Sequence, residues 1–120
     1  MPACIRWIAL FTLLLTCGAG SARAHAILEG SEPTIAATVA EGDVALRLRF
    51  NSRIDHARSV LTLIRPDRSR TTLPIAADTA PEIVASRIAL TPGAYVVRWQ
   101  VLAVDGHITR GDVPFTVKGR

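Results

Sequence analysis

The sequence predicts a small all-β domain, and three observations lead to that class. Short runs of apolar or alternating residues follow one another, and no stretch after residue 24 repeats with a helical period. Turn-forming residues separate these runs at short intervals. About seven short strands in fewer than about 100 residues are typical of an immunoglobulin-like sandwich or a small barrel, and we expect the sandwich.

The expected strands follow from the pattern of side chains. They cover residues 26–30, 44–50, 59–65, 71–75, 83–90, 95–104 and 108–117. In the second of them Leu46, Leu48 and Phe50 alternate with two arginines, so one face is predicted to be core and the other solvent. Residues that favour turns are found at 41–43, 66–67, 91–93 and 105–106. Residues 34–41 are expected to be loosely structured or to form a short turn.

The first 24 residues have the order of a secretory signal peptide. Arg6 is followed by the apolar run 7–15 and then by the small residues of 18–24. That run is too short for a permanent membrane helix, which needs about 20 apolar residues. We therefore expect residues 1–24 to be a cleaved signal and residues 25–120 to form one exported domain. After cleavage we expect no direct insertion into the membrane.

The position of the cut is open between two sites. The small residues at 22–24 fit the rule for signal cleavage and place the cut before His25. Residues 24–26 fit the rule as well, and a cut before Ile27 removes His25. A further alternative is lipidation at Cys17, which follows a sequence that loosely resembles a lipoprotein site.

Removal of the signal changes the composition of the protein. Both cysteines, Cys4 and Cys17, leave with it, so the domain must be stabilised by packing without a disulfide. Because Arg6 and Arg23 leave as well and no acidic residue does, the 14 basic residues fall to 12 against 10 acidic ones, a net charge of +2. The arginines do not cluster with aromatic residues, which does not favour nucleic-acid binding. We expect a monomer.

Two of the three histidines occupy positions with a specific chemical use. As the first residue of a mature chain, His25 offers a free α-amine and an imidazole Nδ1, which together can close a six-membered chelate ring around one metal ion. His107 follows Asp105 across Gly106, and an extended backbone sends both side chains to the same face. The plainer alternatives are a frayed terminus and an ordinary Asp-Gly hairpin turn. His56 lies in a polar connection and is expected to be a solvated loop residue.

Taken together, these features resemble the CopC-type periplasmic copper-binding family over nearly the whole of residues 25–120. The segments that carry the resemblance are His25-Ala26-Ile27-Leu28, Ser31-Glu32-Pro33, Leu48-Arg49-Phe50-Asn51, Thr91-Pro92-Gly93-Ala94-Tyr95-Val96-Val97-Arg98-Trp99, Val104-Asp105-Gly106-His107-Ile108-Thr109-Arg110-Gly111 and Val113-Pro114-Phe115-Thr116-Val117. The late D-G-H-x-x-x-G segment, combined with H-A-x-L at a signal cut, makes the match specific.

The resemblance implies a Greek-key β-sandwich or barrel that binds one Cu(II) per chain. The implied ligands are the amine and imidazole of His25 and the imidazole of His107, with Asp105 as a weaker or axial oxygen ligand. A mainly nitrogen, tetragonal set of this kind suits Cu(II). The resemblance also implies a carrier or buffer that acts in copper homeostasis or resistance in the periplasm, with a CopD-type inner-membrane protein as its partner.

The chain departs from the family pattern at two places. Some relatives have a second, methionine-rich site for Cu(I), whereas Met1 is the one methionine of this sequence and lies in the signal. We therefore expect a Cu(II)-only protein. Some relatives carry a carboxylate two residues after the Phe that ends a strand, where this chain has Ser52. Asp55 is a candidate replacement.

Two other classes of function stay open. An N-terminal histidine with a second histidine is also the copper brace of oxidative polysaccharide monooxygenases. The mature chain is small and has few aromatic residues for a broad binding face, so we expect no enzyme. The other class is a metal-free immunoglobulin-like interaction module that donates an edge strand to a partner. It predicts no tight metal binding and indifference to the identity of residue 25.

Overall fold

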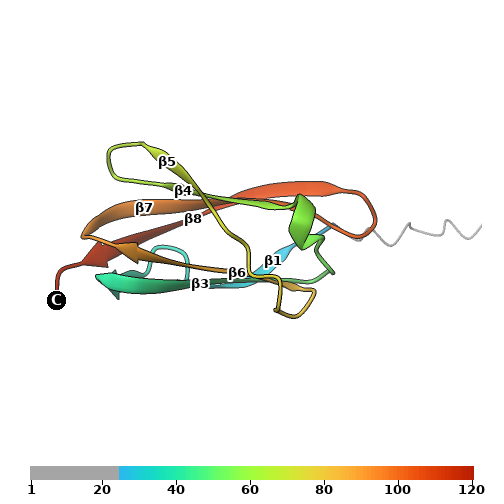
Figure 1. Ribbon diagram of the computed structural model, residues 1–120, viewed down its shortest axis with the longest axis horizontal. Coiled ribbons are helices and arrows are strands. Elements are labelled where there is room, and N and C mark those ends of the chain that lie inside the picture. Colours follow the sequence, from blue (N-terminus) through green and yellow to red (C-terminus); the bar gives the residue numbers. More distant parts are fainter. Residues whose placement is uncertain (1–24) are drawn as a thin grey trace, which may run out of the picture.

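The computed structural model describes residues 25–120 and has the all-β sandwich that the sequence predicts (Figure 1). One sheet has the order β1-β3-β6 and consists of β1 (Leu28–Glu32), β3 (Gly42–Phe50) and β6 (Ile83–Leu90). The other has the order β2-β8-β7-β4-β5 and consists of β2 (Thr38–Ala40), β8 (Ile108–Lys118), β7 (Gly93–Leu102), β4 (Val60–Ile64) and β5 (Arg70–Leu73). One turn of 3₁₀ helix, η2 (His56–Arg58), precedes β4. The expected signal peptide, residues 1–24, lies outside the described residues.

The core lies between the two sheets because the strands alternate in polarity. In β3, alternate side chains from Val44 to Phe50 are buried and the residues between them are exposed. In β7, alternate side chains from Tyr95 to Val101 are buried from the opposite layer. The side chains of two such inner faces interdigitate to form the core of an aligned sandwich. Within residues 25–120, no helix is long and apolar enough to span a bilayer.

Most of the predicted strands are confirmed, with shifts of one or two residues at their ends. β6 has the predicted bounds, and β7 ends at Leu102 because the chain turns immediately afterwards. The prediction for residues 34–41 is wrong in its second half, where Thr38–Ala40 form β2 and pair in parallel with β8. β2 has three residues, with Val39 half-buried between two exposed neighbours, so it is too short to give a periodic signal.

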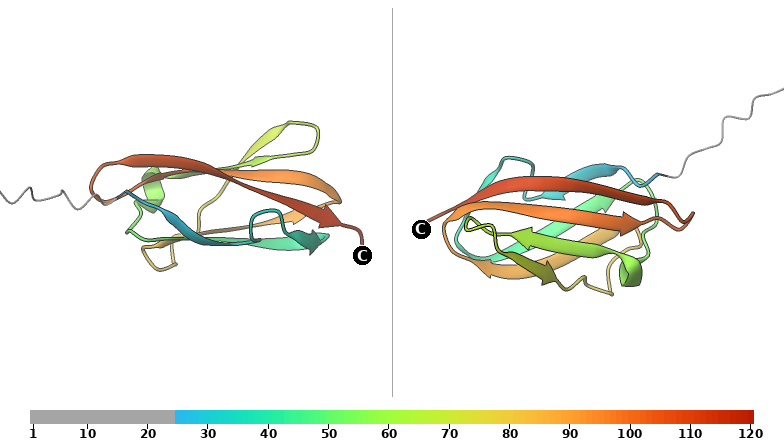
Figure 2. Two further views of the ribbon diagram at one scale, coloured as in Figure 1. Left: turned by 180° about the vertical axis from the view of Figure 1, so that it is seen from behind. Right: turned by 90° about the horizontal axis from the view of Figure 1, so that it is seen from above.

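β1 begins two residues later than predicted. Its pairing with β3 starts at Leu28, opposite Phe50, and the register shifts between Leu28 and Gly30. The side chain of Ala26 lies before the strand and is 2% exposed, as part of the hydrophobic core. The start of the described chain and the turn between β7 and β8 lie at the same end of the sandwich, opposite the C-terminus (Figure 2).

Gly111 lies against the indole of Trp99. The two residues are paired across β7 and β8, and a Cβ on Gly111 would lie 2.3 Å from Cζ2 of Trp99. The indole is buried and meets Phe50 edge-on, with ring centroids 5.1 Å apart. It therefore cannot move aside without disturbing a close-packed core. The last glycine of the D-G-H-x-x-x-G segment is thus a packing requirement of the sandwich.

We expect Gly111→Ala to lower the free energy of unfolding by about 1–3 kcal/mol, the usual cost of overpacking a core. Urea unfolding of the metal-free protein measures this change. Gly119→Ala is the matched control, because the nearest atom to its added Cβ is Cγ of Pro92 at 3.9 Å. The control should change the free energy of unfolding by less than about 0.5 kcal/mol. Equal unfolding midpoints for the two variants would contradict the packing argument.

Candidate metal centre

The turn between β7 and β8 is a tight hairpin that presents Asp105 and His107 at one end of the molecule. The N–H of Gly106 donates to the carbonyl of Ala103 at 2.9 Å, and the N–H of Ala103 donates to the carbonyl of His107 at 2.9 Å. Gly106 has φ of +90°, a conformation that L side chains rarely adopt. A glycine between Asp105 and His107 is therefore required by the shape of the turn.

The carboxylate of Asp105 binds His107 through both of its oxygens. Oδ1 accepts from the backbone N–H of His107 at 3.1 Å, and Oδ2 lies 2.8 Å from Nδ1 of the imidazole. The prediction that these two side chains converge is confirmed, but the extended backbone assumed for it is wrong. They converge because the chain turns at Gly106 and the carboxylate folds back onto the residue two positions on, as in an Asx turn.

This contact fixes the ionisation of Asp105 and the tautomer of His107. Hydrogen bonds from the side chain and then the backbone of His107 hold the pKa of Asp105 below its usual value, and the charges of His107 and His25 add to the effect. An ionised carboxylate can only accept a hydrogen bond, so Nδ1 of His107 carries the proton. In the neutral imidazole, Nε2 then keeps its lone pair. The side chain of His107 is 58% exposed, and its Nε2 points away from the carboxylate of Asp105.

The first residues of the described chain are anchored beside this turn. Oγ1 of Thr109, on β8, donates to the carbonyl of Ala26 at 3.0 Å. Asn51, directly after β3, accepts from the N–H of Ile27 through Oδ1 at 2.7 Å and donates its own N–H to the carbonyl of Ile27 at 3.1 Å. The segment is therefore bound to both sheets.

This anchoring brings His25 to His107. The two imidazole rings meet edge-on, with centroids 4.7 Å apart and an interplanar angle of 60°. All three predicted site residues, His25, Asp105 and His107, thus lie together at one end of the sandwich. In the described part of the chain, no three His, Cys, Asp or Glu side chains are grouped as a metal site.

His56 and Asp55 have other contacts. His56 belongs to η2, is half-buried, and its Nε2 lies 2.7 Å from the carbonyl oxygen of Ile83. The prediction of a solvated loop histidine is wrong, because this ring ties η2 to β6. Asp55 caps η2 by accepting from the N–H of Arg58 at 3.1 Å. The carboxylate of Asp55 therefore has a structural role, as the cap of η2 in the connection between β3 and β4.

Asn51 and Thr109 are the residues near the centre that sequence reasoning did not select. Asn51 binds the backbone of Ile27, which lies 24 positions away in the chain, and Thr109 binds the backbone of Ala26, which lies 83 positions away. The available signal for Asn51 was its place at the end of a strand in the segment 48–51. Thr109 lies in the segment 104–111 but carries no ligand chemistry of its own, so its contact was not foreseeable from the pattern.

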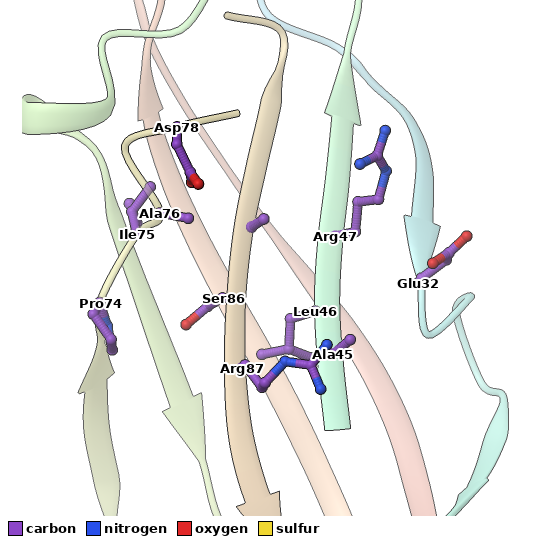
Figure 3. A pocket seen from close by; sticks show the side chains of 11 residues that line it. Glu32, Ala45, Leu46, Arg47, Pro74, Ile75, Ala76, Asp78, Ser86 and Arg87 are labelled. Atoms are coloured by element: carbon purple, nitrogen blue, oxygen red, sulfur yellow. The ribbon is translucent and has the colours of Figure 1, made fainter. Parts of the chain in front are cut away.

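An open groove of about 620 Å³ lies along β3 and β6 (Figure 3). Its lining includes Arg47 and Arg87 together with the carboxylates of Glu32 and Asp78, so its charge is mixed. The buried hydroxyl of Ser86 also lines it, with no hydrogen-bond partner among residues 25–120. The residues of the candidate centre do not line this groove, and its mixed charges do not indicate a class of ligand.

Comparison with known proteins finds similarity over most of the described residues. The family model described as the CopC domain matches residues 28–118. The protein YobA of Escherichia coli K12 is 33% identical over 99 residues, which cover 79% of this chain and 80% of YobA.

Two solved structures are also similar. CopC from Methylosinus trichosporium OB3b is 26% identical with a TM-score of 0.74, and the match covers 80% of this chain and 96% of that one. PcoC from Escherichia coli, described as a methionine-rich copper resistance protein, is 27% identical with a TM-score of 0.63, and the match covers 79% of this chain and 100% of PcoC.

We expect His107→Ala to raise the pKa of Asp105 toward its ordinary value, because the variant removes the side-chain hydrogen bond that lowers it most. A carboxyl carbon NMR titration of the metal-free protein measures the change. Asp112 is the internal control, since its pKa is lowered by Arg98 and is independent of His107. If Asp105 moves no more than Asp112, the imidazole contact does not exist in solution.

Proposed function

This chain belongs to the CopC domain family, and on that premise we propose that it is a periplasmic carrier or buffer of Cu(II). It binds one Cu(II) per chain at the mature amino terminus and acts in copper homeostasis or resistance. The observation that carries the proposal is the contact between the rings of His25 and His107, with centroids 4.7 Å apart. Copper is the cargo of this protein, and no enzymatic activity is proposed.

The donor atoms at this end of the sandwich support Cu(II) as the ion. A chain that begins at His25 offers its amine and Nδ1, and His107 offers Nε2, which is a nitrogen-rich set that suits Cu(II). Asp105 orients the imidazole of His107, as carboxylates commonly do behind a metal-bound histidine. For its oxygens also to supply a weaker, axial contact to the ion, the carboxylate would have to leave Nδ1 of His107, which points away from Nε2.

The packing of Ala26 supports a signal cut before His25. A cut before Ile27 would remove a side chain that is 2% exposed and the carbonyl that Thr109 binds. The mature domain would then lose part of its core along with two of the proposed donors. The proposed mature chain therefore begins at His25, and it is released in the periplasm after the signal is removed.

The methionine content supports a Cu(II)-only carrier. Thioether sulfur is the donor that Cu(I) prefers, and this sequence has one methionine, Met1, within the proposed signal. PcoC, by contrast, is described as methionine rich. A protein without thioether donors in its mature chain holds copper as Cu(II) and passes it on in that state. A CopD-type inner-membrane protein is the proposed recipient.

The proposal is tested by adding Cu(II) to metal-free protein that intact mass spectrometry verifies to begin at His25. We expect tight one-to-one binding and a tetragonal, nitrogen-rich electron paramagnetic resonance spectrum. The control carries one extra alanine before His25, which displaces the free amine from the chelate ring. We expect this control to bind more weakly and to give a changed spectrum. Weak binding, or the same affinity and spectrum for the two forms, would contradict the proposal and favour the metal-free interaction module.

Alanine substitution of His107 and of Asp105 should weaken Cu(II) binding to different extents. His107→Ala removes a nitrogen donor and is expected to weaken Cu(II) binding more than Asp105→Ala, which removes the carboxylate that orients the imidazole of His107. Losses of about 10- to 100-fold are typical for residues that act behind a ligand, so Asp105→Ala should fall in that range. Competition titration with a chelator of known affinity measures both. An equal or larger loss for Asp105→Ala would contradict the assigned roles.

Binding should also weaken steeply as the pH falls from about 8 to 5. The ordinary pKa of an α-amine is about 7.7–8.0 and that of imidazole about 6.5, so protons compete with Cu(II) for these nitrogens across that range. Affinity is therefore highest when the nitrogens are deprotonated and is lost as they take up protons. Competition titrations at fixed pH values measure the trend, and a flat profile would exclude nitrogen donors.

A further inference from the structure

We propose that Asn51 and Thr109 are positioning residues that hold the amino terminus beside His107 before the metal arrives. The inference rests on the proposed Cu(II) site and deepens it by naming the side chains that preorganise that site. Neither residue is a proposed ligand. Both act on the backbone of residues 26–27, directly after His25.

Asn51 continues the pairing of β1 with β3 beyond its last backbone pair, Leu28 with Phe50. Its N–H donates to the carbonyl of Ile27 at 3.1 Å, as the next residue of a ladder does. Its side-chain Oδ1 accepts from the N–H of Ile27 at 2.7 Å, where a regular ladder uses a backbone carbonyl. The side chain at position 51 therefore decides whether Ile27 is bound through its carbonyl alone or through both its carbonyl and its N–H.

Thr109 binds the same segment from the other sheet. It lies on β8 two residues after His107, and its Oγ1 donates to the carbonyl of Ala26 at 3.0 Å. The methyl group of Ala26 is enclosed in the core shared by the two sheets. Residues 26–27 are thus held by three hydrogen bonds and one buried side chain. In a mature chain that begins at His25, one residue is left beyond the anchor.

Preorganisation of this kind strengthens metal binding without any new ligand. A donor that is already in place loses less conformational freedom when the ion binds than a donor on a frayed terminus. Removal of contacts that orient ligands from behind typically costs 10- to 100-fold in metal affinity. We expect about a 10-fold loss for each of these two side chains, since each removes one of the three hydrogen bonds.

The first test needs no copper. Hydrogen exchange of the Ile27 amide is measured by NMR in metal-free protein that begins at His25. Exchange should be slowed in the wild-type protein and become fast in Asn51→Ala. It should stay slowed in Asn51→Asp, which keeps an acceptor oxygen at that place. Fast exchange of Ile27 in the wild-type protein overturns the inference, whatever the protein does with copper.

The second test measures Cu(II) affinity and the electron paramagnetic resonance spectrum of Asn51→Ala and Thr109→Val. Thr109→Val keeps the shape of the side chain and removes the donor, and Thr109→Ser should restore binding. Thr72→Val, at an exposed position of β5, is the matched control and should bind as the wild-type protein does. Thermal unfolding checks that each variant is folded.

The outcomes of the two tests separate the two proposals. Tight wild-type binding that is unchanged in affinity and spectrum in both variants overturns the positioning role and leaves the Cu(II) carrier intact. Weak binding by the wild-type protein overturns the carrier. In that case slow exchange at Ile27 that depends on Asn51 would still establish the anchor, and fast exchange would show that the anchor does not form.

Discussion

The candidate centre depends on the enclosure of Ala26 between the two sheets. Chain ends normally fray, because a few terminal residues bury too little surface to offset the entropy of ordering them. Here a buried methyl group, the hydroxyl of Thr109 and the amide of Asn51 hold the segment in place. One residue before Ala26, His25 meets the ring of His107. The geometry of the centre is therefore a consequence of how the sandwich closes at this end.

The fold could be predicted wherever one strand face is core and the other is solvent. β3 shows this most clearly, because its buried side chains alternate with exposed residues that include Arg47 and Arg49. β2 could not be predicted in the same way, since its three residues form a strand only by pairing with the last residues of β8. That pairing connects distant parts of the sequence and leaves no local period. Gly111 was predicted as part of a motif, and its contact with Trp99 supplies the physical reason for it.

The candidate centre was predictable in its side chains and much less so in its supports. His25, Asp105 and His107 carry chemistry that can be recognised from residue type and spacing. Their supports act through backbone atoms, as when Asn51 binds the N–H and carbonyl of Ile27. A hydrogen bond to the backbone does not depend on the identity of the bound residue, so it leaves no mark at that residue in the sequence. The error on His56 has the same origin, because its partner is the carbonyl of Ile83.

The centre combines a fixed backbone with the exposed imidazole of His107, and different residues supply these two properties. Ala26, Asn51 and Thr109 fix the terminus, whereas the turn after β7 leaves the side chain of His107 58% exposed. A deeply buried centre would require local opening of the fold before an ion could leave. An exposed one lets another molecule approach the ion directly, and Val104 and Ile108 add exposed apolar surface on either side of the turn. In the proposed carrier, preorganisation supplies affinity while exposure permits transfer, so the two properties can be changed independently by substitution.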